Sequence, residues 1–132
     1  MTASGVTFDT GILIALERRR QSAWAIFRRL NERAARITIP APVIGEWWRG
    51  RTDVRDAILL AVHVEPLTSS IARLAGEALA KVPVATTIDA FVMASAALRG
   101  DVVYTGDVDD LEALRAFFPG VRVLVPRQPR SA

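Results

Sequence analysis

The sequence of 132 residues contains no cysteine and only one histidine, His63. The absence of cysteine excludes disulfide bonds, thiolate zinc sites and cysteine nucleophiles, and it suits a reducing compartment. One histidine is too few for a histidine-rich metal site and argues against a Ser–His–Asp triad. Lysine is equally scarce, with Lys81 alone. Acid–base or metal chemistry in this chain must therefore rest mostly on carboxylates.

Long hydrophobic runs are also missing. No stretch reaches the ~18 consecutive apolar residues of a membrane span. Near the N-terminus an apolar stretch is interrupted by Asp9 and followed, not preceded, by arginines, which is the wrong order for a secretory signal. We therefore expect a cytoplasmic protein with no membrane partner. Its length and its 51% of hydrophobic residues favour a single domain with a buried core.

Positive charge is concentrated in one region of the chain. Residues 18–55 hold ten arginines against three acidic residues, a net charge of +7, whereas the regions before and after it carry −2 each. Such a region favours a polyanion or an acidic protein as partner. The alternative is that these arginines lie on the solvated faces of amphipathic helices.

Short β-rich runs alternate with helical patterns, and no repeat or linker interrupts them. We predict strands at 5–9, 36–41, 61–66, 101–105 and 121–126. We predict helices at 10–19, 22–34, 42–50, 53–60, 68–82, 87–100 and 109–120. This alternation predicts an α/β domain with a parallel sheet covered by helices on both faces. Residues 127–132 are predicted to be a flexible tail.

Four carboxylates lie close to the predicted strand ends. Asp9 closes the first strand, and Asp107 follows the fourth strand by two residues. Glu46 lies on the short helix after the second strand, and Asp89 lies in the first turn of the helix before the fourth. Because ligands of parallel sheets bind outside the carboxyl ends of the strands, we expect these four acids to meet there.

Each acid also has a structural interpretation. Asp89 could favour the positive end of its helix, with Thr87 as the cap, and Glu46 could pair with Arg49. Asp9 is the hardest to explain in this way, because it interrupts an apolar element at a point where a charge is not expected to help folding.

Two further aspartates, Asp109 and Asp110, precede the last predicted helix. Aspartate at such a position caps free backbone N–H groups. Either residue could instead serve as an additional metal ligand. The sequence leaves both interpretations open.

Converging carboxylates need a counter-charge. Like charges held a few ångström apart repel each other and raise each other's pKa. A divalent cation removes this repulsion, and all-oxygen ligands favour Mg²⁺ or Mn²⁺. Such a metal lowers the pKa of a bound water and neutralises phosphate oxygens, while a basic region supplies contacts to a nucleic acid. The residues therefore predict metal-assisted phosphodiester hydrolysis.

Three segments carry a family resemblance: FDTGILIAL at 8–16, TTIDAFVMASAALRG at 86–100 and VVYTGDVDDL at 102–111. Together with Glu46 after the second strand, they closely resemble PIN-domain ribonucleases, in particular VapC-type toxins of toxin–antitoxin pairs. The resemblance implies a doubly wound PIN domain over residues 1–126. It further implies an endoribonuclease that uses metal-activated water and leaves 5′-phosphate and 3′-hydroxyl ends.

The resemblance also implies the site residues. Asp9, Glu46, Asp89 and Asp107 would form the catalytic acidic quartet. The metal ligands would be Asp9, Asp89 and Asp107, with Asp9 and Asp107 bound directly to Mg²⁺ or Mn²⁺ and Asp89, like Glu46, bound directly or through water. The hydroxyls of Thr10 and Thr105 would orient a carboxylate or a substrate phosphate.

The partners implied by the resemblance are an RNA substrate, a VapB-type antitoxin that blocks the acidic pocket, and a second copy in a homodimer. The helices at 11–30 are expected to form the groove for an antitoxin helix. Of Trp47 and Trp48, one is expected in the core, and the other could stack on an RNA base.

Two other classes of protein are alternatives to this interpretation. A phosphoaspartate protein would need a second acid near Asp9 and, in a receiver domain, also a lysine after a late strand. FDTGI has no second acid, and Lys81 lies in a predicted helix. A non-catalytic RNA- or protein-binding α/β module would use the arginines for binding and the carboxylates only as caps. Replacing Asp9 separates the last class from the nuclease, because a binding module would keep its function.

Overall fold

The computed structural model describes residues 5–126 and shows one five-stranded sheet in which all strand pairs are parallel. The strands are β1 (Val6–Phe8), β2 (Ile37–Pro40), β3 (His63–Glu65), β4 (Val102–Tyr104) and β5 (Val123–Leu124). Their order is β3-β2-β1-β4-β5. The sheet therefore grows outward from β1 in both directions, which confirms the predicted doubly wound α/β fold. The predicted tail at 127–132 lies outside the described residues.

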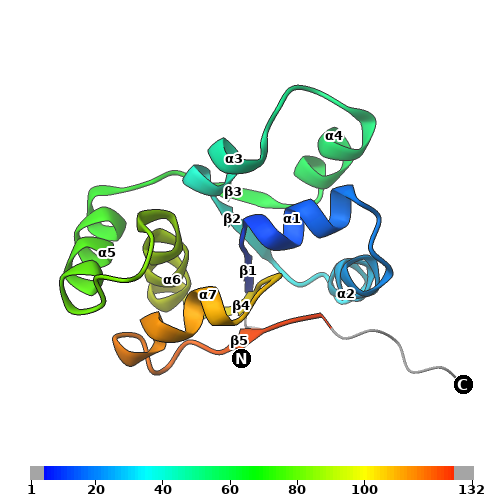
Figure 1. Cartoon of the computed structure of the whole chain (residues 1–132). Helices are drawn as coiled ribbons and strands as arrows, with labels where there is room; N and C mark the ends of the chain where they lie inside the picture. Colours follow the sequence, from blue (N-terminus) through cyan, green and yellow to red (C-terminus); the bar gives the residue numbers. More distant parts are fainter. Residues whose placement is uncertain (1–4, 127–132) are drawn as a thin grey trace, which may run out of the picture.

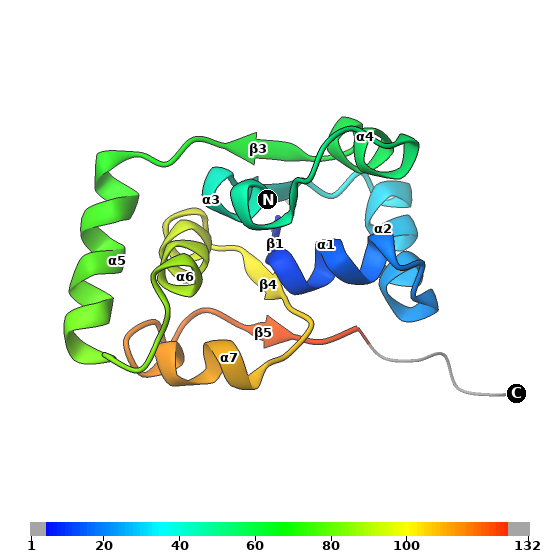
Figure 2. The same cartoon turned by 45° about the horizontal axis from the view of Figure 1, so that its top comes forward.

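Helices cover both faces of the sheet, as predicted (Figures 1 and 2). Helices α1, α2 and α4 lie on one side, and α5, α6 and α7 lie on the other. Their bounds are α1 (Thr10–Glu17), α2 (Gln21–Glu32), α3 (Ala41–Trp47), α4 (Asp53–Leu60), α5 (Ser69–Lys81), α6 (Thr87–Arg99) and α7 (Asp109–Glu112). Within residues 5–126, no helix is long and apolar enough to span a membrane.

The last predicted helix is shorter than expected. Instead of one helix over 109–120, the chain forms the single turn of α7 and then a 3₁₀ turn, η1 (Ala113–Ala116). Pro119 and Gly120 follow closely, and neither supports further helix. The helical segment therefore stops well before Gly120.

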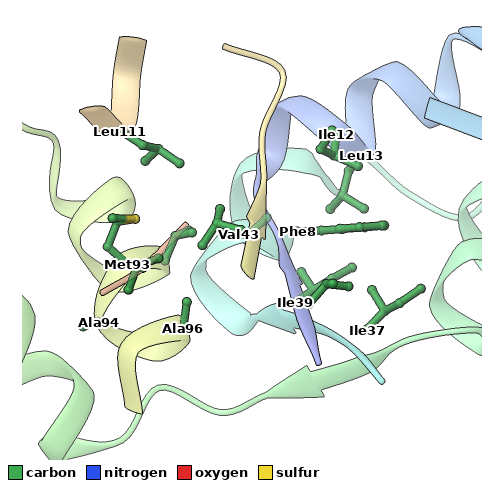
Figure 3. Close-up of a cluster of buried hydrophobic side chains, with 14 of the residues drawn as sticks. Phe8, Ile12, Leu13, Ile37, Ile39, Val43, Met93, Ala94, Ala96 and Leu111 are labelled. Carbon is green, nitrogen blue, oxygen red and sulfur yellow. The ribbon is translucent and has the colours of Figure 1, made fainter. Parts of the chain in front are cut away.

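The two faces of β1 differ in polarity, because its side chains alternate between them. Phe8 is fully buried, and its ring lies 6.3 Å from that of Phe27 on α2. Figure 3 shows Phe8 together with Ile12 and Leu13 of α1, while Met93 of α6 lies across the sheet. Because strand side chains point alternately to opposite faces, Thr7 must face the α6 side. The α1 side of β1 is thus hydrophobic, and its α6 side is polar.

A network centred on Arg99 fills this polar side. The Arg99 guanidinium forms ion pairs with Glu65 and with Asp101, the latter at 3.0 Å, and donates to Thr7 Oγ1 at 2.6 Å. Thr7 in turn donates to Asp101 at 2.8 Å, and Ser95 donates to Glu65 at 2.6 Å. Burial alone would raise the pKa of Glu65, but the hydrogen bonds from Arg99 and Ser95 outweigh it and lower that pKa. The network ties α6 to three strands or strand ends.

We expect Arg99→Leu to lower the free energy of unfolding by about 2–4 kcal/mol at neutral pH, because it leaves two mostly buried carboxylates unpaired. Urea denaturation measures this loss. Arg115→Leu, which breaks only the exposed pair with Glu112, serves as the control and should cost at most about 0.5 kcal/mol. Because the pKa of Glu65 is lowered in the folded state, the wild-type advantage should be lost as the pH falls from the ordinary pKa of glutamate through this lowered pKa. Equal losses in the two variants would contradict a central role for Arg99.

Candidate active site

The four predicted acids line one pocket at the carboxyl edge of the sheet. This pocket has a volume of ≈350 Å³, and Asp9, Glu46, Asp89 and Asp107 all lie along it. Asp110 is a further acid in its lining. The chain thus brings together the residues that the sequence placed at strand ends and on the neighbouring helices.

Asp9 is held by two segments of the chain. It is the N-cap of α1, where its Oδ1 accepts a hydrogen bond from the Ile12 N–H at 3.2 Å. Its Oδ2 accepts a hydrogen bond from the Thr105 hydroxyl at the end of β4. Only 8% of Asp9 is exposed. No structural role was predicted for Asp9 from the sequence, but its side-chain oxygen caps α1, which needs an acceptor for its first N–H groups.

Asp107 is fixed by its own loop. Its N–H donates to Thr105 Oγ1 at 3.2 Å, and its Oδ1 accepts from the Asp109 N–H at 3.0 Å. The N-cap residue of α7 is Val108, and it makes no side-chain cap. The predicted capping by Asp109 or Asp110 is therefore not observed, since Asp107 accepts the N–H at this helix start. Asp110 instead lines the acidic pocket.

Asp89 lies in the first turn of α6 and is partly buried. The N-cap is Thr86, not Thr87 as predicted: Thr86 Oγ1 accepts from the Asp89 N–H at 3.2 Å. The helix begins at Thr87, so the cap falls one residue earlier than the sequence suggested. Asp89 lines the pocket together with Glu46 of α3 and Asp110 of α7.

Glu46 lies on α3 and is exposed. Its Oε1 accepts a hydrogen bond from Thr10 Oγ1 at 2.6 Å. The predicted pair with Arg49 is wrong, because the Arg49 guanidinium donates to the backbone carbonyls of Gly45 and Trp48. Glu46 is thus oriented by a hydroxyl from α1, next to Asp9 in the sequence.

The two tryptophans beside Glu46 differ in burial. Trp47 is 3% exposed and belongs to the core, which confirms that one of the pair packs inside. Trp48 is partly buried and packs against the core from outside. Neither is among the residues that line the acidic pocket.

Burial and mutual repulsion make the charged form of the pocket acids unfavourable. Burial raises the pKa of Asp9 from 3.8 to about 6, and repulsion from Asp89 adds to the effect. Burial also raises the pKa of Asp89, with repulsion from Asp110 and Glu46. Within residues 5–126, no lysine or arginine forms an ion pair with any of these acids. The pocket is therefore suited to a cationic ligand.

The donors have the chemistry of a hard-cation site. They are carboxylates and threonine hydroxyls, and oxygen ligands of this kind suit Mg²⁺ or Mn²⁺. In the described part of the chain, no three or more acidic or histidine side chains stand close enough together to enclose an ion. Mg²⁺ in proteins commonly binds one or two carboxylates and keeps several waters. The residues present fit such an open site.

Two glycines that the sequence analysis did not single out shape the edge of the pocket. A Cβ on Gly11 would lie 2.9 Å from the Gly106 nitrogen, and a Cβ on Gly106 would lie 3.2 Å from the Gly11 Cα. Only residues without side chains allow this close approach. The available signal was the glycine in each of the segments DTG and TGD, two residues after Asp9 and one before Asp107.

A model of the PIN domain matches residues 6–116. The chain belongs to the PIN-domain family. No curated protein matches it. The predicted PIN-like fold is thereby confirmed, whereas the outer limits of the predicted domain, 1 and 126, stay a prediction.

Several solved structures share the PIN fold of this chain. VapBC2 from Rickettsia felis, bound to a DNA fragment from its promoter, matches with a TM-score of 0.73 and 13% identity over 91% of this chain and 97% of that one. A toxin–antitoxin complex from Klebsiella pneumoniae matches with a TM-score of 0.67 and 20% identity over 95% and 100%. FitAcB from Neisseria gonorrhoeae matches with 0.64 and 16% over 92% and 97%. At these identities the likeness concerns the fold.

We expect Asp9→Asn to stabilise the metal-free protein at neutral pH by about 1–2 kcal/mol. The folded-state pKa of about 6 lies above the ordinary 3.8, so the folded protein binds more protons than the unfolded chain between these values. The free energy of unfolding of the wild type should therefore fall as the pH rises from about 4 to about 6.

Urea denaturation across this pH range measures the difference between the two proteins. The advantage of Asp9→Asn should disappear near pH 4, where Asp9 is protonated. The control is Glu77→Gln, which removes an exposed acid on α5 outside the pocket and should leave the pH dependence unchanged. A variant that is less stable than the wild type at neutral pH would show that the hydrogen bonds of Asp9 outweigh its burial.

Proposed function

We propose that this PIN-domain protein is a Mg²⁺- or Mn²⁺-dependent endoribonuclease and the toxin of a type II toxin–antitoxin system. The observation that supports this most directly is the pocket itself. Four carboxylates from separate elements line it, and none has a basic partner among the described residues. Charges kept only for capping or pairing would have no reason to share one pocket.

The proposed roles follow from how each side chain is held. Asp9 and Asp107 would bind the ion directly, and Asp89 and Glu46 would hold it directly or through its waters. When bound, the ion would supply a water of lowered pKa and neutralise charge on the phosphate. Thr105 fixes the Asp9 carboxylate, and Thr10 orients Glu46.

RNA is the proposed substrate because the acidic pocket adjoins the basic part of the chain. The turn between α1 and α2, together with α2 itself, carries five of the ten arginines of residues 18–55. Phosphates contribute the sequence-independent part of nucleic-acid binding. The rival proposal is a non-catalytic binding module, in which the arginines would bind and the acids would serve only the fold.

An antitoxin is the proposed protein partner. The structure from Klebsiella pneumoniae that shares the fold is a toxin–antitoxin complex. In this chain a cavity of ≈440 Å³ between α2 and α4 is lined by Arg19, Trp24, Asp53, Val54 and Ala57. Its surface is more apolar than polar and suits one face of a partner helix. A homodimer is proposed as well, on the resemblance to the family alone.

We expect the purified protein to cut total cellular RNA into discrete fragments in Mg²⁺ or Mn²⁺. EDTA should abolish cutting, because the carboxylates alone cannot activate water or neutralise the phosphate. Asp9→Asn and Asp107→Asn should each lower the rate by at least about 100-fold. Gel electrophoresis measures the products, and sequencing of fragment ends identifies the target.

Glu77→Gln is the matched control for this experiment, since it removes one exposed carboxylate far from the pocket in the fold. It should retain full activity. If the folded wild type, the pocket variants and the control all behave alike in metal and in EDTA, the nuclease proposal is wrong and the binding module replaces it.

We expect Ala57→Arg to weaken the antitoxin complex by about 100-fold, because it places a long charged side chain in the apolar groove between α2 and α4. Ala57 is exposed, so the substitution should not disturb folding. Pull-down from an extract of the source organism, followed by titration of the captured protein, measures the effect. RNA cleavage by the variant should equal that of the wild type. If an inhibitory partner binds the wild type and Ala57→Arg equally well, the antitoxin binds outside this groove.

A further inference from the structure

A second cavity borders the acidic pocket at the contact between Gly11 and Gly106. It has a volume of ≈390 Å³ and lies between α1, the start of α2 and the chain after β5. Figures 1 and 2 show the chain after β5 running toward α1 and α2. Both glycines line both cavities. At this contact, the two cavities are therefore separated only by Gly11 and Gly106, which have no side chains.

The second cavity differs in charge from the first. Arg18 and Arg20 line it, together with the hydroxyl residue Ser22, and no acidic residue is in its lining. Its remaining surface is mostly apolar, with Ile14 and Ala15 of α1 among the residues that form it. Its volume falls in the range of about 300–1,000 Å³ of small-ligand pockets. The cavity thus offers cationic groups beside an apolar surface.

The turn between α1 and α2 sets which arginines face this cavity. Arg19 has a φ of 57°, in the left-handed region that non-glycine residues seldom adopt. Arg18 and Arg20 line the second cavity, while Arg19 lines the groove between α2 and α4. Arg18 and Arg20 are exposed, and neither forms an ion pair within residues 5–126. Their charges are therefore available to a ligand.

We infer that this second cavity, here named the arginine subsite (Arg18, Arg20, Ser22, Ile14 and Ala15), binds the nucleotide next to the cleaved phosphodiester of an RNA strand. Arg18 and Arg20 pair with the phosphate, and the apolar surface contacts the sugar and base. The inference rests on the proposed function, because it takes the acidic pocket as the place of cleavage.

Charge distinguishes an RNA strand from an acidic peptide as the occupant. The acidic pocket repels any polyanion that extends from the arginine subsite across Gly11 and Gly106. For RNA, the divalent ion proposed there offsets this repulsion at the phosphate. An acidic peptide would gain nothing comparable, since its carboxylates would compete with those of the pocket for the ion. The continuity of the two cavities therefore favours a nucleic-acid strand.

The test compares two double variants that lose the same charge. R18Q/R20Q removes the arginines of the subsite, and R28Q/R29Q removes two exposed arginines of α2 that line neither cavity. Fluorescence anisotropy with a random-sequence RNA pool of about 12 nucleotides gives the affinities. The buffer contains Ca²⁺ in place of Mg²⁺, so that a divalent ion still offsets the charge of the acidic pocket, and a gel confirms that no strand is cut. We expect R18Q/R20Q to bind about tenfold more weakly, with a salt dependence reduced by about 0.7–1.4 in log–log slope. R28Q/R29Q should stay within about twofold of the wild type.

A third variant tests the apolar surface without changing charge. Ala15→Leu enlarges a partly buried side chain that lines the subsite. It should weaken RNA binding while the salt dependence stays that of the wild type. Circular dichroism and urea denaturation confirm that each variant is folded.

The outcomes separate this inference from the proposed function. If the wild type cuts RNA in Mg²⁺ but the two double variants bind equally well or equally poorly, the arginine subsite is wrong and the nuclease stands. If the wild type cuts no RNA but only R18Q/R20Q loses binding, the subsite stands as an RNA site and the nuclease proposal is wrong. If the wild type binds no RNA, the subsite is wrong regardless of cleavage.

Discussion

The Asp9 carboxylate joins two segments that are 96 positions apart, through its hydrogen bonds to the Ile12 N–H and the Thr105 hydroxyl. These bonds fix the start of α1 against the end of β4, where the sheet changes direction. Gly11 and Gly106 can then touch, which sets the border of the pocket. The price is a buried carboxylate whose pKa is raised to about 6. The geometry of the whole carboxyl edge depends on keeping this acid in place.

The chain buries its carboxylates in two different ways. Under α6, Glu65 and Asp101 are paired with Arg99, and the pKa of Glu65 is lowered. At the carboxyl edge, Asp9 and Asp89 have no basic partner among the described residues, and burial raises the pKa of both. Pairing satisfies the first group within the fold, whereas the second group leaves an interaction to be made with a ligand. The presence of an arginine partner thus separates the structural acids Glu65 and Asp101 from the candidate functional acids of the pocket.

Much of the fold and the gathering of the acids could be predicted, because both depend on regular patterns. Alternating strands and helices specify a parallel sheet, and its strand ends share one edge, so Asp9 and Asp107 had to come close. Local details could not be predicted in the same way. The cap of α6 moved by one residue to Thr86, since the segment TT offers two equivalent caps. Glu46 accepts a hydrogen bond from Thr10, 36 positions away, and does not pair with Arg49. This contact could not be predicted, because only the tertiary fold brings α1 to α3.

The features that the sequence analysis missed depend on contacts between residues that are far apart in the sequence. Gly11 is an ordinary helix residue until Gly106 approaches it. Thr7 is part of a β-rich run, and its polar role under α6 requires Arg99, which lies 92 positions away. The charge asymmetry of residues 18–55 was visible, but not that successive arginines at the α1–α2 turn face different cavities. A left-handed residue at this turn converts a uniform run of arginines into two surfaces, one beside the acidic pocket and one in the groove toward α4.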